Sequence, residues 1–119
     1  MIKIKIPGEI PSKKNSRINT RSGMSFPSKQ YQQWHSIAAL YCAKIKPILN
    51  KQLEISINFI HGTLRRRDSD NAVSSVLDLL VDMKIIQDDN WKIVKRIIVN
   101  NEYQKNNPYC EIQIKEIEE

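Results

Sequence analysis

The chain has 119 residues, 40% of them hydrophobic, and a formal net charge of +6. This length suits one domain with a single core and is too short for two. The first residues alternate between apolar and basic types, and no apolar run reaches the length of a membrane span. The composition therefore predicts a soluble, cytoplasmic protein without a membrane segment.

The charge is distributed unevenly along the chain. Residues 1 to 67 contain 13 Lys and Arg and two acidic residues, whereas residues 68 to 119 contain six Lys and Arg and 11 acidic residues. The first part is suited to binding a polyanion, and the second part contains the acidic candidates for a metal site. Two cysteines, Cys42 and Cys110, fit no metal-ligand spacing and are expected to be free thiols in a reducing compartment.

The hydrophobic pattern of the first half predicts a strand, a helix and a second strand. Isoleucines at positions 2, 4 and 6 alternate with lysines until Pro7 and Gly8 end the strand. A polar loop is expected over residues 11–27. Ser28 is suited to cap a helix that continues to about residue 45, and residues 52–61 alternate as a half-buried strand.

The second half predicts a helix and two further strands. The helix begins at Ser69 or Asp70 and ends near residue 83, and its Asp78 and Asp82 are expected to be solvated on the face opposite the apolar stripe. Strands are expected over residues 92–100 and 109–117, with a turn at residues 106–108. The order β-α-β-α-β-β predicts one α+β domain over residues 1–119, with two helices packed on one mixed sheet.

The most informative motif is residues 65–71, Arg-Arg-Arg-Asp-Ser-Asp-Asn. Arginines bind phosphates, and the oxygens of Asp68 and Asp70 are the hard ligands that Mg²⁺ prefers. A second acidic pair, Asp88 and Asp89, follows about one helix later, and the intervening helix allows the chain to reverse. The combination indicates hydrolysis or transfer at a phosphodiester.

Each part of this pattern also has an ordinary structural explanation. Asp68 and Asp70 are equally suited to capping a helix, since acidic side chains accept hydrogen bonds from its first N–H groups. The arginines are also compatible with a solvated loop, and Asp88 and Asp89 with a simple turn. His61 is a candidate for a phosphate contact. Tyr31 and Trp34 are expected in the core, whereas the sequence leaves the environment of Trp91 open.

These motifs resemble those of the RusA-type Holliday junction resolvases, small endonucleases common in prophages. The resemblance covers most of the chain. Residues 65–71, followed by Asp78 and the pair at 88–89, are similar to the R-D-x-D-N and D-D motifs of the family. Residues 11–16, Pro-Ser-Lys-Lys-Asn-Ser, with Phe26-Pro27-Ser28 and Tyr31, are similar to its N-terminal loop entering the first helix.

The resemblance implies a homodimer that binds four-way DNA junctions and makes paired, Mg²⁺-dependent nicks. It assigns catalysis to three aspartates, with a fourth as an acidic neighbour in the metal set: Asp68, Asp70 and Asp89, with Asp88. The expected DNA-binding residues are Lys13, Lys14, Asn15, Arg17, Arg65, Arg66 and Arg67. Asn71 matches the motif asparagine and is expected to orient a carboxylate or cap the helix, whereas Ser74 stands where the family commonly carries a lysine.

Two other functions are compatible with the residues alone. One is a non-catalytic nucleic-acid-binding or regulatory protein in which the aspartates cap a helix. The other is a nuclease that acts on flaps or single strands. The basic half of the chain would look the same in the first case, so metal-dependent cleavage is what separates a binding protein from an enzyme.

Overall fold

The structure is a computed structural model that describes residues 1–11, 17–19, 23 and 25–117, and for 17–19 and 25–27 only the backbone. Within these residues the elements, in chain order, are β1 (Ile2–Pro7), β2 (Arg17–Asn19), β3 (Ser25–Pro27), α1 (Lys29–Cys42), β4 (Gln52–His61), α2 (Ser69–Asp82), β5 (Val94–Tyr103) and β6 (Tyr109–Ile117). The predicted α+β class and the order of its main elements are confirmed.

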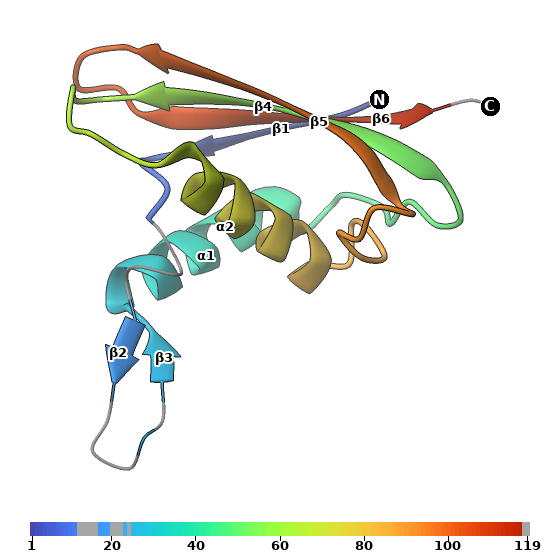
Figure 1. Cartoon of the computed structure of the whole chain (residues 1–119), viewed down its shortest axis with the longest axis horizontal. Coiled ribbons are helices and arrows are strands. Elements are labelled where there is room, and N and C mark those ends of the chain that lie inside the picture. Colours follow the sequence, from blue (N-terminus) through green and yellow to red (C-terminus); the bar gives the residue numbers. More distant parts are fainter. Residues whose placement is uncertain (12–16, 20–22, 24, 118–119) are drawn as a thin grey trace.

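The main sheet has the strand order β1-β6-β4-β5. β6 pairs antiparallel with both β1 and β4, whereas β4 and β5 run parallel. Parallel neighbours need a crossover connection, and α2 provides it. Both helices lie against the same face of the sheet, as Figure 1 shows. The end of β4 therefore leads directly into the loop and helix that carry the arginine and aspartate motif.

The core lies between this sheet and the two helices. β4 contributes Leu53, Ile55 and Ile57, which are fully buried, and α2 contributes Leu79 and Leu80. The alternation of buried and partly exposed residues from Gln52 to Phe59 follows from this arrangement, because the other face of β4 is covered by no helix in the described part of the chain. On that open face a pair of side chains from β4 and β5 forms an ion pair, Glu54 with Arg96 at 3.1 Å.

Most predicted boundaries are confirmed, including the cap of α1. The Ser28 Oγ accepts a hydrogen bond from the Tyr31 amide at 3.1 Å. The prediction of a loop throughout residues 11–27 was wrong, because β2 and β3 pair as a short antiparallel hairpin. β5 begins two residues later than predicted, since the amides of Ile93 and Val94 bond to the Asn90 carbonyl in a turn.

The prediction that Asp82 is a solvated side chain is confirmed, since 51% of its side chain is exposed. Its carboxylate also lies 3.0 Å from the His35 Nε2 of α1. Burial raises the pKa of Tyr31 to about 12, and the charges of Asp78 and Asp82 add to that effect. These two aspartates therefore face the neighbouring helix. Among the described residues, no helix is long and apolar enough to cross a membrane.

Candidate active site

The candidate site is built around the corner where β4 ends and α2 begins. Asp68 occupies the N-cap position with extended backbone, yet its carboxylate accepts no capping hydrogen bond from any described residue. Asp70 follows in the first turn, and both side chains are exposed. The capping explanation therefore holds for the backbone of Asp68 but leaves its carboxylate available. Two neighbouring carboxylates are suited to hold Mg²⁺ together with a phosphate.

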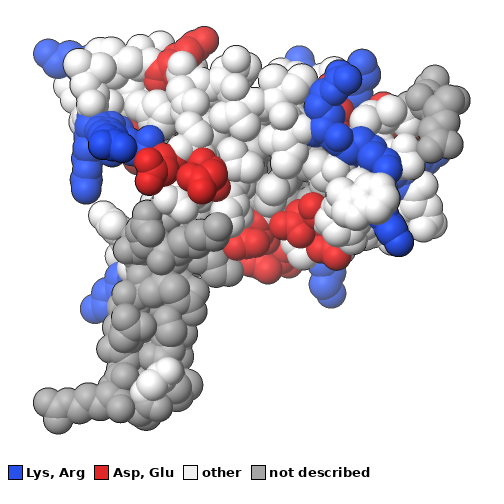
Figure 2. Space-filling view, viewed as in Figure 1, with Lys and Arg blue, Asp and Glu red and all other residues white. Residues whose placement is uncertain are grey.

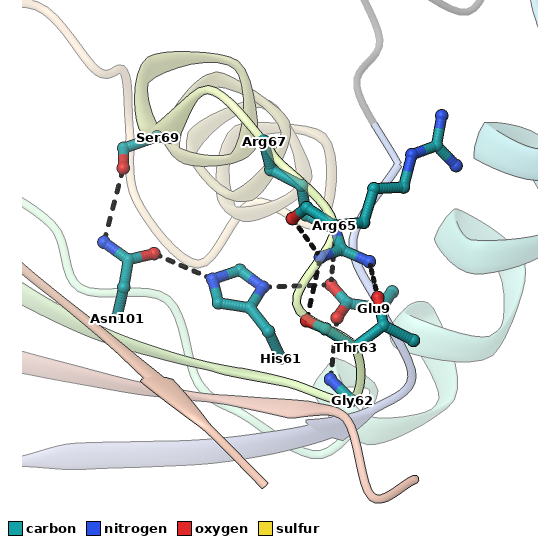
Figure 3. Close-up of polar contacts among 8 residues, drawn as sticks. All are labelled: Glu9, His61, Gly62, Thr63, Arg65, Arg67, Ser69 and Asn101. Atoms are coloured by element: carbon teal, nitrogen blue, oxygen red, sulfur yellow. Dashed lines mark hydrogen bonds and ion pairs between the residues drawn. The ribbon is translucent and has the colours of Figure 1, made fainter. Parts of the chain in front are cut away.

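Arg67 does not point to solvent in the way an arginine of a phosphate-binding arm would. Its guanidinium donates to the Arg65 carbonyl at 2.9 Å and to the Thr63 hydroxyl at 2.9 Å. Its Nε lies 3.4 Å from a carboxylate oxygen of Glu9. Figure 3 shows the Arg65 side chain pointing away from these contacts. The three arginines are therefore not equivalent: Arg67 braces the loop, whereas Arg65 and Arg66 are exposed.

Glu9 connects this loop to the end of β4. One carboxylate oxygen accepts a hydrogen bond from the Gly62 amide at 2.9 Å, and the other lies 3.2 Å from the His61 Nδ1. The opposite ring nitrogen of His61 lies 2.9 Å from the Asn101 Oδ1, and the Asn101 amide nitrogen donates to the Ser69 hydroxyl at 3.3 Å. This chain of contacts, drawn in Figure 3, ends on the residue between Asp68 and Asp70.

A surface hollow of about 570 Å³ opens beside the same corner. It is lined by residues 9–11, by Trp34 and Gln30 of α1, and by residues 65–68 with Asn71. The Ser75 hydroxyl contacts the Pro11 carbonyl at 3.0 Å, which fixes the start of the β1–β2 loop against α2. Lys13, Lys14 and Asn15 lie outside the described residues, and Arg17 is placed only as part of β2.

The second acidic pair lies in the turn after α2. The Asp88 carboxylate accepts hydrogen bonds from the Asp89 amide at 2.8 Å and from the Asn90 side chain at 2.9 Å. The Asn90 bond, and then the Asp89 amide, lower the pKa of Asp88. Partial burial raises the pKa of Asp89, and the neighbouring Asp88 and Asp78 act in the same direction. Asp88 thus holds the turn together, and Asp89 is the better candidate ligand.

The four candidate ligands lie at opposite ends of α2, with Asp68 and Asp70 at its start and Asp88 and Asp89 in the turn after it. Asp89 lies within electrostatic reach of Asp78, which is eight residues beyond Asp70 and therefore about 12 Å further along the helix axis. Among the described residues, no three His, Cys, Asp or Glu side chains lie close enough to hold a metal ion together. Asp68 and Asp70 alone suit Mg²⁺, which is often held by one or two carboxylates and fills its other positions with water and phosphate.

The sequence comparison fits this arrangement. A family model of endodeoxyribonuclease RusA matches residues 7–115. The chain belongs to the RusA family of endodeoxyribonucleases. The match includes the arginine and aspartate corner and the turn after α2, and it confirms the family resemblance of the motifs. No curated protein matches the chain.

The basic surface of this RusA-family chain is divided. Figure 2 shows Lys and Arg side chains in two groups on one face, at the left over the β4–α2 loop and at the right over the turn after α2 and the start of β5. Acidic side chains lie next to the left-hand group and lower on the same face, and the surface directly between the two groups is mostly uncharged. In the turn after α2 and the start of β5, the exposed basic residues include Lys92, Lys95 and Arg96. The candidate ligands Asp68 and Asp70 directly follow the arginine loop, at the start of α2.

Several residues of the RusA-family site were not evident from the sequence. Glu9 and Asn101 connect to His61 only because the fold brings positions 9, 61 and 101 together. Glu9 carried one signal, since it is one of only two acids among the first 67 residues. An isolated carboxylate in a basic segment is a candidate for pairing with an arginine. Ser74, the departure from the family lysine, is half-buried on α2.

Proposed function

We propose that this RusA-family chain is a Mg²⁺-dependent endonuclease that resolves four-way DNA junctions by paired nicks during recombination and repair. The observation that carries the proposal is the pair of exposed carboxylates, Asp68 and Asp70, at the start of α2 beside an arginine-lined hollow. The family match supports DNA cleavage as the activity. The junction substrate, the metal and the paired cuts belong to the proposal.

The proposed roles follow from the chemistry of each side chain. The proposed catalytic set is Asp68, Asp70 and Asp89, of which Asp68 and Asp70, adjacent at the start of α2, would hold Mg²⁺. The bound ion would supply an activated water and stabilise charge on the phosphate. Arg65 and Arg66 bind the phosphates next to the cut, and Arg67 keeps their loop in place. Lys13, Lys14, Asn15 and Arg17 extend the contact along the DNA backbone. Asn71 orients a carboxylate at the first turn of α2.

The proposed assembly is a homodimer. A four-way junction presents two equivalent strands for cutting, and a twofold dimer presents two equivalent sites. The proposed compartment is the cytoplasm, which is consistent with two buried cysteines that form no disulfide. Burial raises the pKa of Cys110 to about 12, so its thiol stays protonated and unreactive.

The decisive experiment compares a synthetic mobile four-way junction with a linear duplex of the same sequence, each in Mg²⁺ and in EDTA. The proposal expects symmetric nicks in the junction that require Mg²⁺, and little cutting of the duplex. Tight junction binding without cleavage in Mg²⁺ would instead support the non-catalytic binding protein. Preferred cutting of flaps or single strands would support a nuclease of different substrate shape.

A further inference from the structure

Trp91 is an exposed aromatic side chain that the proposed nuclease chemistry leaves unexplained. It lies in the turn between α2 and β5, and 71% of its surface is exposed. The other tryptophan, Trp34, is buried in the core with 5% exposed. An indole ring is a large apolar surface, and one left in water at a functional site is a candidate contact for a ligand.

The turn that carries Trp91 is held by several hydrogen bonds. The Asn90 side-chain oxygen accepts from the Lys92 amide at 3.0 Å, and its carbonyl accepts from the amides of Ile93 at 3.1 Å and Val94 at 2.9 Å. Val94 is buried and starts the strand that pairs with β4. The backbone under the indole is therefore fixed before any ligand arrives, which lowers the entropic cost of a contact.

The surroundings of the ring are cationic. The Lys95 Nζ lies 4.8 Å from the ring centroid, which is a cation–π contact. Lys92 is the adjacent residue, and Arg96 follows Lys95 in β5. All three side chains are exposed. An aromatic face bordered by exposed lysines combines the two features that single-stranded nucleic-acid sites use, a surface for stacking and charges for phosphates.

The position of the ring connects it to the proposed active site. Trp91 is two residues beyond Asp89, the third candidate ligand. Within a continuous duplex the faces of the bases are stacked on one another, whereas a branch point interrupts this stacking. A single ring is also far smaller than a specific protein interface, which buries on the order of 800 Å² on each partner. The chemistry around Trp91 therefore favours a nucleobase over a protein.

We propose that Trp91 stacks on a nucleobase exposed at the branch point, while Lys92 and Lys95 bind phosphates beside it. This inference rests on the proposed function, because it takes branched DNA as the substrate. Trp91 then determines specificity, since it adds affinity only where stacking within the DNA is interrupted.

The test measures equilibrium binding in EDTA, so that no strand is cut, to a four-way junction and to a linear duplex. Trp91→Ala should weaken junction binding by about 5- to 150-fold and change duplex binding by less than about twofold. Trp91→Phe should keep most of the junction affinity. Tyr41→Ala is the matched control, because it removes an aromatic ring that is 50% exposed on α1.

Fluorescence gives a second readout. With 2-aminopurine at the branch point, wild-type protein should change the probe emission, and Trp91→Ala should abolish that change. The fluorescence of Trp91 is the difference between the emission of the wild-type protein and that of Trp91→Phe. The junction should quench this fluorescence, and the duplex should not. Unchanged junction affinity for Trp91→Ala, or equal losses on junction and duplex, would overturn the inference.

The two proposals fail in different ways. If Trp91→Ala binds and cuts the junction normally while Asp70→Asn is inactive, the stacking inference is wrong and the nuclease assignment stands. If wild-type protein cuts no DNA in Mg²⁺, the nuclease assignment fails whatever the binding result. Loss of junction binding by Trp91→Ala in that case would still support stacking by a non-catalytic protein.

Discussion

Glu9 and Arg67 form an ion pair in which a carboxylate oxygen lies 3.4 Å from the guanidinium Nε. The contact joins the segment after β1 to the loop before α2, across 58 positions of sequence. Because the same carboxylate also bonds to the Gly62 amide and contacts His61, one side chain fixes both ends of the loop that carries Arg65 and Arg66.

Glu9→Gln should reduce catalysis much more than stability. The amide keeps an oxygen for the Gly62 amide but removes the negative charge that faces Arg67 and His61. The pair is partly solvated, so stability should fall by only about 1 kcal/mol or less. A small displacement of the loop should slow single-turnover cleavage by up to about 100-fold. Both quantities are measured on the same preparation, by thermal unfolding and by cleavage in excess enzyme.

The matched control for that variant is Glu54→Gln, which removes the charge of an ion pair with Arg96 on the open face of the sheet. It should leave cleavage near the wild-type rate. Equal effects of Glu9→Gln and Glu54→Gln would show that Glu9 has no positioning role.

Asp70→Asn should eliminate Mg²⁺-dependent cleavage and leave junction binding intact or tighter. The substitution removes a ligand charge close to the phosphate without changing the basic loop. Gel-shift titration and a cleavage time course check the two parts. Asp82→Asn, lower on the same helix and beside His35, is the control and should cut normally. Cleavage by Asp70→Asn near the wild-type rate would contradict the assignment.

The arginines should separate into two classes by salt dependence. Arg65→Ala and Arg66→Ala should each weaken binding and flatten the plot of log affinity against log salt, by up to about 0.9 for each phosphate that the variant no longer binds. Arg67→Ala should leave the slope nearly unchanged and lower the cleavage rate, because its guanidinium is bonded within the loop. A slope that falls equally in all three variants would show that Arg67 binds DNA directly.

Ser74→Ala should retain most activity, and Ser74→Lys should preserve or raise it. A serine at this position supplies neither the charge nor the reach of the lysine that the family commonly carries there. Ser75→Ala is the contrasting variant, since the Ser75 hydroxyl is buried and contacts the Pro11 carbonyl. It should lower the melting temperature. A folded Ser74→Ala protein as inactive as Asp70→Asn would place Ser74 in the catalytic set.

The protein should be a dimer in solution without DNA. Light scattering across the concentration range used for cleavage assays measures this directly. The twofold arrangement expected of paired nicking requires two copies at one junction. A monomer at concentrations where junctions are cut in both strands would contradict the proposed assembly.

Most of the fold could be predicted from the sequence, because apolar residues recur at the spacing of a strand or a helix in most elements. The alternation from Leu53 to Phe59 predicted β4 at both ends, and Ser28 predicted the start of α1. The hairpin of β2 and β3 was missed because each strand has three residues, too few for a visible alternation.

The candidate site was predictable only where its residues are contiguous. Residues 65–71 form one motif, and the structure places them at one corner. The contacts of Glu9 and Asn101 depend on strand register, which aligns His61 with Tyr103 across β4 and β5 and so fixes the neighbourhood of Asn101. The length of α2 places Asp89 near Asp78 and away from Asp68 and Asp70. The spacing of the motifs in the sequence does not indicate this separation.

The strand order gives the last strand of the chain an unusual importance for folding. β6 lies between β1 and β4, so β1 has no strand neighbour in the main sheet until residues 109–117 are available. During synthesis the strands of the basic N-terminal half keep unpaired edges until β6 has been made. Formation of the sheet then depends on contacts between residues that are almost a whole chain apart. Such long-range pairing folds slowly and exposes the nascent chain to aggregation. A stop before residue 109 would therefore remove the middle of the sheet and leave β1 detached from β4.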